Sequence, residues 1–286
     1  MRIRRLLLTG LLIGTVSAGV CACAPIYALN TVTITRGLVV AQNLPYGNDP
    51  RQKLDVYAQP GRKDAPVVVF VHGGNWTSGS KDEYVFLGDS LARAGFVAVV
   101  ISYRLAPTVQ YPGFVRDTVR ALRWAKDHAG RYGGDPKRLF VMGHSAGAFN
   151  AAAATVRRDL LAEQGLSPSD LRGVIGLAGP YDYDPAYSRE KRVYPPGATR
   201  NRVMPAAQVT PGLPPFLLLV AARDQIVSPE NGTRMRVALE ANRVPVRYLE
   251  VPGVDHFSLM GAMARRLTFL GPVRDEVIRF VREHAE

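Results

Sequence analysis

Cysteine is almost absent from this chain of 286 residues, and the two that occur, Cys21 and Cys23, lie close to the N-terminus. No disulfide can therefore form among residues 24–286. A domain of this size does not need one, because its hydrophobic core is large enough to stabilise the fold. The sequence also lacks an H-E-x-x-H motif, a Cys/His cluster and a phosphate-binding G-x-x-x-x-G-K loop. We therefore expect a protein that uses no metal and no cofactor.

Acidic residues are outnumbered by basic ones, and the formal net charge is +12. Such a balance indicates nucleic-acid binding where the basic residues gather on one element or alternate with aromatic residues. Here the arginines are scattered, and the pairs Arg157-Arg158 and Arg265-Arg266 are isolated. We interpret the charge as a solvated surface and expect no nucleic-acid partner.

Charged residues are missing altogether between Arg5 and Arg36. The basic start, the apolar run over residues 6–20 and the small residues after it are typical of an export signal, which we place at residues 1–22. An uncleaved membrane anchor is the alternative, because the uncharged stretch approaches the ~20 residues that a spanning helix needs.

Both cysteines follow this apolar run. Val20-Cys21-Ala22-Cys23 resembles a bacterial lipobox, with an aliphatic residue three places before the modified cysteine and a small one just before it. We therefore predict a diacylglyceryl group on Cys23 and a membrane tether over residues 23–30. An ordinary cleaved signal with incidental cysteines is the alternative. Ala24 after the cysteine favours the outer membrane, so the predicted location is the cell envelope, facing the periplasm.

Short, fully apolar runs recur from residue 31 onward. A run such as Val67–Val71 is too apolar for a strand with one solvent face and is typical of a buried parallel strand. The expected strands are Thr31–Val40, Lys53–Tyr57, Val67–Val71, Phe96–Ile101, Arg138–Met142, Val174–Leu177, Phe216–Ala221 and Val246–Val251. Segments with apolar residues every three or four positions are expected to be helices: Val115–Ala129, Ala146–Val156, Glu230–Ala241 and Val273–Val281.

This alternation favours right-handed βαβ crossovers, and therefore an α/β fold. We expect a mostly parallel sheet of about eight strands with helices on both faces. The length fits one domain, over residues 31–286. Residues 181–213 are rich in Pro, Tyr and Arg and show no clear period. They are too long for a bare connection, so we expect a short cap or lid there.

The strongest local signal is Gly143-His144-Ser145-Ala146-Gly147, between an expected strand and an Ala-rich expected helix. A serine in a tight strand-to-helix turn projects its hydroxyl above the sheet edge, and the flanking glycines avoid clashes in that turn. The helix that follows directs its N-terminal amides at the same place. Ser145 is therefore the predicted nucleophile, and the amide of Ala146 is a predicted oxyanion donor.

A second glycine-rich segment, His72-Gly73-Gly74-Asn75-Trp76, follows the expected strand Val67–Val71. Acyl transfer develops negative charge on a carbonyl oxygen, and backbone amides must already point at it. Gly73 and Gly74 are the predicted donors from this loop, although Asn75 could replace one of them. His72 is expected to hold the loop by hydrogen bonds rather than to act as a base.

If the catalytic residues follow the chain order Ser, Asp, His, then a carboxylate and a general base are expected after Ser145. His256 lies in a loop directly after the last expected strand, whereas the other downstream histidine, His284, is close to the C-terminus on a charged helix. Asp224 follows the strand Phe216–Ala221 and is the predicted carboxylate that fixes the imidazole tautomer. Asp255 is the rival, but its adjacency to His256 makes side-chain convergence awkward.

These residues resemble the esterase/lipase branch of the α/β-hydrolase superfamily. His72–Trp76 is similar to the HGG-x-W segment of carboxylesterases, feruloyl-esterase-like and kynurenine-formamidase-like enzymes. Tyr103-Arg104-Leu105-Ala106-Pro107 resembles the Y-R-L-A-P segment of hormone-sensitive-lipase-like esterases. The resemblance covers residues 31–286, and the segment around Cys23 looks like the start of bacterial lipoprotein members.

The resemblance implies an α/β-hydrolase fold and a serine carboxylesterase that forms an acyl-serine intermediate without a cofactor. The short cap favours small ester substrates with short acyl or aryl groups. Arylformamidase or peptidase activity on the same triad is the alternative, and a non-catalytic binding protein of the same fold is a further one. The oligomeric state stays open.

Overall fold

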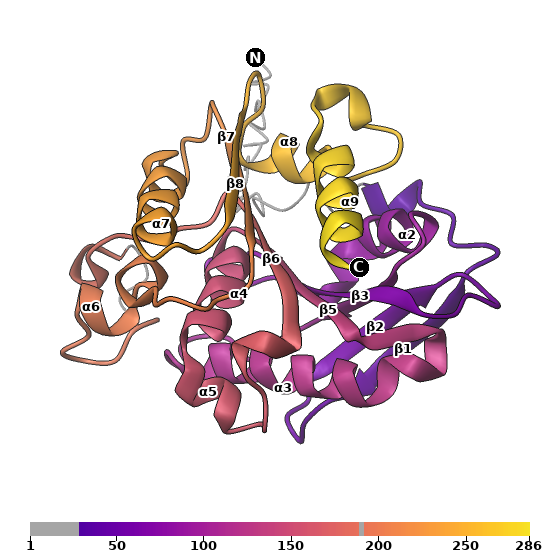
Figure 1. The fold of residues 1–286 in the computed structure, drawn as a ribbon, viewed down its shortest axis with the longest axis horizontal. Coiled ribbons are helices and arrows are strands. Elements are labelled where there is room, and N and C mark those ends of the chain that lie inside the picture. The colour runs from indigo at the N-terminus through magenta and orange to yellow at the C-terminus, as the bar shows by residue number, and fades with distance from the viewer. Residues whose placement is uncertain (1–28, 189–191) are drawn as a thin grey trace, which may run out of the picture.

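A single eight-stranded sheet runs through the structure (Figure 1). The computed structural model describes residues 29–188 and 192–286. The strands are β1 (Val39–Pro45), β2 (Lys53–Ala58), β3 (Ala65–Val71), β4 (Val97–Ile101), β5 (Gly134–His144), β6 (Leu171–Leu177), β7 (Phe216–Ala221) and β8 (Val246–Val251). Their order is β1-β2-β4-β3-β5-β6-β7-β8. The pairs β1–β2 and β2–β4 are antiparallel and the others are parallel, which confirms the predicted mostly parallel sheet.

Helices cover both faces of the sheet, as predicted. They are α2 (Val85–Arg93), α3 (Gly113–His128), α4 (Ala146–Val156), α5 (Arg158–Ala162), α6 (Arg200–Val203), α7 (Glu230–Ala241), α8 (His256–Gly261) and α9 (Val273–His284). Buried residues of α2, α8 and α9 form one core cluster on the sheet, and those of α3, α4, α5 and α7 form the other. In Figure 1, α2 and α9 lie together on one side of the central strands, and α3, α4 and α5 on the other.

The first predicted strand, Thr31–Val40, is wrong in position. Residues 29–31 are helical, and β1 begins only at Val39. Alternating β-branched residues predict a strand, but here they lie on the surface outside the sheet: Val32 is 55% exposed. β1 instead continues to Pro45, beyond the end of the predicted strand. It contains an irregularity between Ala41 and Leu44, where the amide of Asn43 donates to the Asp55 carboxylate at 2.8 Å.

In the described residues of the expected cap, 181–188 and 192–213, short helical turns lie among irregular chain: η4 (Pro185–Tyr187), α6 and η5 (Pro205–Gln208). Nε and Nη2 of Arg200 donate to the two oxygens of the Asp182 carboxylate, at 2.5 and 2.9 Å. The amide of Asp182 donates to the Asn231 side chain on α7 at 3.0 Å. The segment is therefore fastened to the domain near the carboxyl end of β6.

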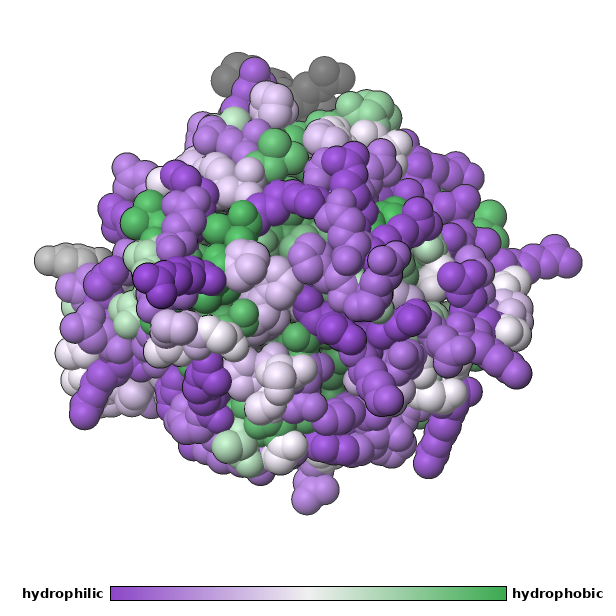
Figure 2. All heavy atoms as spheres, in the orientation of Figure 1, coloured by the Kyte–Doolittle hydropathy of each residue, from purple (hydrophilic) through white to green (hydrophobic). Residues whose placement is uncertain are grey.

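Figure 2 shows a face that is mostly hydrophilic, with hydrophobic residues visible between the polar ones. The predicted export signal, Cys23 and residues 24–28 of the predicted tether lie outside the described residues. Across the described part of the chain, no helix is long and apolar enough to cross a membrane.

Candidate active site

Ser145 lies in a sharp turn between the end of β5 and the start of α4. Its backbone has φ 55° and ψ −124°, a conformation that residues other than glycine rarely adopt. The turn is held because the Ser145 amide donates to the carbonyl of Leu177, at the end of β6, over 2.8 Å. The strain thus occurs at the predicted nucleophile.

Close packing beneath this turn explains one of its glycines. A Cβ on Gly147 would lie only 2.0 Å from the carbonyl oxygen of Val71, at the end of β3. Only glycine lets α4 begin this close to the strand that carries the glycine-rich loop. Because Ala146 is the first residue of α4, its amide has no acceptor within the helix and is available to a ligand.

Asp224 and His256 form a buried pair. Asp224 follows β7, and its Oδ2 lies 2.7 Å from Nδ1 of His256, the first residue of α8. The other carboxylate oxygen accepts the amides of Ile226 and Val227, each at 2.9 Å. A carboxylate only accepts, so Nδ1 carries the imidazole proton and Nε2 presents a lone pair. This is the tautomer that a general base needs.

The rival carboxylate, Asp255, has a different task. It caps the N-terminus of α8, accepting the amides of Phe257 at 3.1 Å and Ser258 at 2.8 Å. The Ser258 hydroxyl donates to the same oxygen at 2.7 Å. Led by the bond from the Ser258 backbone, these contacts lower the pKa of Asp255. It is therefore the start of α8, and not the tautomer of His256, that Asp255 fixes.

His144, which precedes the serine, contacts the predicted base. Its Nε2 lies 3.0 Å from the backbone carbonyl oxygen of His256, and the two ring centroids are 4.7 Å apart. The carbonyl only accepts, so Nε2 carries the proton. Burial and then the proximity of His256 hold the pKa of His144 well below its usual value. Sequence reasoning missed this residue, although its place inside the G-x-S-x-G motif was a signal.

The glycine-rich loop lies beside the serine. An added Cβ on Gly73 would be 3.2 Å from the Cβ of Ser145 and 3.2 Å from the carbonyl oxygen of His144. Gly74 has φ 107°, and a Cβ there would lie 2.2 Å from the Ser78 carbonyl oxygen, so the turn requires glycine. The structure thus brings the predicted donor Gly73 against the predicted nucleophile.

Trp76 anchors the loop from below. Its indole Nε1 donates to the Asn150 side chain on α4 at 2.8 Å. The indole packs edge-on against Phe149, at 5.1 Å between centroids, and against Tyr194 of the expected cap, at 6.0 Å. One buried ring therefore joins the loop, the helix behind the serine and the cap.

His72 is a buried structural group. Its Nδ1 donates to the Gly73 carbonyl at 2.6 Å, and its ring stacks on Tyr103 at 4.3 Å. Burial is the main cause that lowers its pKa to about 3. The imidazole is therefore neutral at physiological pH and holds the loop. Within the described residues, no group of three or more His, Cys, Asp or Glu side chains could hold a metal ion.

Several solved structures that resemble this one are named as esterases. A bacterial heroin esterase matches with a TM-score of 0.74 at 21% identity, over 92% of this chain and 89% of its own. The likeness shows the fold, and the predicted α/β-hydrolase fold is confirmed.

The sequence comparisons narrow the class to a family. The BD-FAE family profile matches residues 54–239, and the chain belongs to this family. Esterase LipC of Mycobacterium tuberculosis is 31% identical over 87% of this chain and 69% of its own length. A probable isoprenylcysteine α-carbonyl methylesterase of Oryza sativa is 34% identical over 51% of this chain, which spans only 36% of that relative. The predicted class, a carboxylic-ester hydrolase, is confirmed.

Proposed function

We propose that the chain hydrolyses carboxylic esters by a double displacement at Ser145. The single observation that carries this proposal is the buried pair of His256 and Asp224, 2.7 Å apart. The pair follows the carboxyl ends of parallel strands, as the strained serine does. His256 Nε2 takes the hydroxyl proton as the serine oxygen attacks the ester carbonyl. His256 then gives that proton to the departing alcohol, which leaves an acyl-serine.

In the second half of the reaction, His256 takes a proton from water as the water oxygen attacks the acyl carbonyl. The bond between the acyl carbon and Ser145 Oγ then breaks, the acid leaves, and His256 returns the proton to Ser145 Oγ. Both tetrahedral states carry an oxyanion, which the amides of Gly73, Gly74 and Ala146 stabilise. The proximity of Gly73 to Ser145 and the free amide at the start of α4 support this assignment. The chain's own residues perform every step.

The substrate is proposed to be a small ester with a short acyl or aryl group. The cap is short, which favours a small substrate, and its Tyr194 is buried against Trp76 of the oxyanion loop. A relative whose name specifies a methyl ester is consistent with a small alcohol group.

A panel of p-nitrophenyl esters of increasing acyl length, with amide and formamide analogues, tests this proposal. We expect turnover to be highest for the shortest esters, and Ser145→Ala to reduce it by about 10⁶-fold. A fluorophosphonate probe should add its mass at Ser145. Labelling of another serine would refute the nucleophile. Faster turnover of formamides or amides would replace the ester by the arylformamidase or peptidase alternative.

We also propose that the enzyme is held at the bacterial cell envelope by a lipid on Cys23. Only five residues lie between Cys23 and Leu29, so the domain would lie within about 20 Å of the bilayer. Near that end of the domain, Ile34 is 67% exposed, and Arg265 and Arg266 line the same small hollow as Leu29 and Ile34. Apolar and basic side chains suit an anionic lipid surface.

Intact-mass measurement of the mature protein tests the anchor. A diacylglyceryl-modified N-terminus at Cys23 is expected, and Cys23→Ser should abolish lipid labelling, whereas Cys21→Ser should not. An unmodified terminus, or a retained Met1, would reject lipidation and leave the hydrolase proposal untouched.

A further inference from the structure

The carbonyl groups of the glycine-rich loop have donors on the side facing the interior. The Tyr103 hydroxyl donates to the His72 carbonyl at 3.2 Å and lies 3.5 Å from the Gly73 carbonyl. The Gly73 carbonyl also accepts His72 Nδ1 at 2.6 Å. The carbonyls of His72 and Gly73, which precede the amides of Gly73 and Gly74, are therefore both held by hydrogen bonds.

Holding these carbonyls fixes the amides of the next residues. In a planar trans peptide, the C=O and the following N–H point in opposite directions, and neither peptide here is cis. With the His72 carbonyl on Tyr103, the Gly73 amide must face away from Tyr103. With the Gly73 carbonyl on His72, the Gly74 amide must face away from His72. These are the two loop amides assigned to the oxyanion.

We propose that Tyr103 is a positioning residue that orients the oxyanion amides of Gly73 and Gly74. We also propose that Arg51 holds Tyr103 and Gly79, which packs against the loop, in place. The inference rests on the oxyanion hole of the proposed function. Tyr103 is fully buried and stacks on His72 with an angle of 15° between the rings. It lies behind the loop, so its effect on the reaction passes through the amides.

Arg51 links the two segments, from the turn between β1 and β2. Its Nε donates to the Tyr103 carbonyl at 2.8 Å, and its Nη2 donates to the Gly79 carbonyl at 2.6 Å. Gly79 is packed against the start of the loop, since an added Cβ there would lie 2.7 Å from the Gly73 carbonyl oxygen. Hydrogen bonds from a charged group are stronger than neutral ones. The Arg51 guanidinium therefore holds both Tyr103 and Gly79 firmly.

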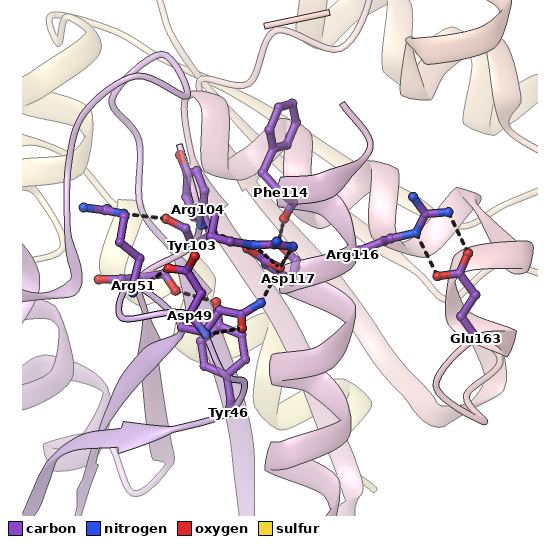
Figure 3. Close-up of polar contacts among 12 residues, drawn as sticks. Tyr46, Asp49, Arg51, Tyr103, Arg104, Phe114, Arg116, Asp117 and Glu163 are labelled. Carbon is purple, nitrogen blue, oxygen red and sulfur yellow. Dashed lines mark hydrogen bonds and ion pairs between the residues drawn. The ribbon is translucent and has the colours of Figure 1, made fainter. Parts of the chain in front are cut away.

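Asp117 lies on α3 and is fully buried. It contacts the residues that follow Arg51 and Tyr103 in the sequence. It accepts Gln52 Nε2 at 2.7 Å, beside Arg51, and both the backbone amide and the guanidinium of Arg104, beside Tyr103, at 3.0 and 2.7 Å. Figure 3 shows Arg51, Tyr103, Arg104 and Asp117 drawn together in this network. The oxyanion loop is thus supported by contacts that reach neither serine nor substrate.

Tyr103→Phe is the test, because it keeps the ring that stacks on His72 and removes only the hydroxyl. We expect kcat for p-nitrophenyl acetate to fall by about 10- to 100-fold, somewhat less than deletion of an oxyanion donor costs, with KM changed less than about twofold. Affinity for a trifluoromethyl ketone, which forms a tetrahedral oxyanion on a serine, should fall by the same factor as kcat.

Thr155→Val is the matched control. It also removes a buried hydroxyl that donates to a backbone carbonyl, that of Ala151 on α4 at 2.9 Å, but one outside the loop and outside the contacts of Tyr103 and Arg51. Circular dichroism melts show that both variants are folded, and the control should keep kcat and ketone affinity.

Arg51→Lys keeps the charge but not the two-pronged geometry, so it should reproduce part of the loss of Tyr103→Phe. Unchanged kcat and ketone affinity in Tyr103→Phe would overturn the inference, as would an equal loss in Thr155→Val. If Ser145→Ala keeps its turnover, the proposed function itself fails. If Ser145→Ala is inactive and Tyr103→Phe is not impaired, only this inference fails.

Discussion

Replacement of His72 by asparagine removes a buried imidazole that is neutral in the folded protein. Its pKa is lowered to about 3, chiefly by burial, whereas an imidazole in the unfolded chain has the ordinary value of 6.5. Between these two values the unfolded chain binds a proton at this site and the folded protein does not. Asparagine does not titrate, and its side-chain amide can still donate toward the Gly73 carbonyl.

Protons that bind only to the unfolded state favour unfolding, so the contribution of His72 to stability is present above pH 6.5 and is lost as the pH falls toward 3. Each pH unit within that window is worth up to about 1.4 kcal/mol for one such group. Between pH 7 and pH 4, the free energy of unfolding should therefore fall by about 3 kcal/mol more in the wild type than in His72→Asn.

The assay is urea unfolding of both proteins at pH 4, 5, 6 and 7, followed by circular dichroism. The difference at pH 7 measures the packing lost with the ring, and its change with pH isolates the titration of His72. Carboxylates that titrate in both proteins cancel in that comparison. Parallel dependences on pH for the two proteins would refute the buried, neutral imidazole.

Two other substitutions follow from the carboxylates. Asp224→Asn should reduce turnover by on the order of 10⁴-fold, because an amide at this place favours the wrong tautomer of His256, whereas Asp255→Asn should reduce turnover far less. Initial rates with p-nitrophenyl acetate rank the two variants, and the opposite ranking would identify Asp255 as the partner of His256. Asp117→Ala should lower the free energy of unfolding by about 3 to 5 kcal/mol, because it leaves the Arg104 charge and buried donors unpaired; a loss below 1 kcal/mol in urea titration would contradict this.

Buried parallel strands were the most predictable part of the fold. Phe216–Ala221 agrees with the buried strand β7 at both ends. Ala146–Val156 agrees with α4, and Val246–Val251 agrees with β8, which is mostly half-buried. Runs that are apolar on every side have one stable solution, the middle of a covered sheet. The first strand was predicted too early, because residues 31–38 carry the alternation of a strand but lie outside the sheet, and pairing is a tertiary property.

The candidate site was predictable where its parts are local motifs. Ser145, Gly73 and Gly74 stand in short sequences whose glycines have a steric reason. The contacts of Arg51 and Tyr103 were not accessible in this way, because they join segments 28 to 52 residues apart through backbone carbonyls that any residue possesses. Only the folded arrangement shows which carbonyls these donors reach.

The order of the strands places the two halves of the site on strands of different local stability. Ser145 and Gly73 follow β5 and β3 in the centre of the sheet, whereas Asp224 and His256 follow β7 and β8 at its end. Within the described part of the chain, β8 pairs with β7 on one side only, and it is mostly half-buried. Edge elements of this kind open in sub-global fluctuations that leave the rest of a domain intact. Fraying of this edge would withdraw the proton acceptor from an otherwise native molecule, so catalysis should be silenced by heat or urea before the bulk of the secondary structure melts.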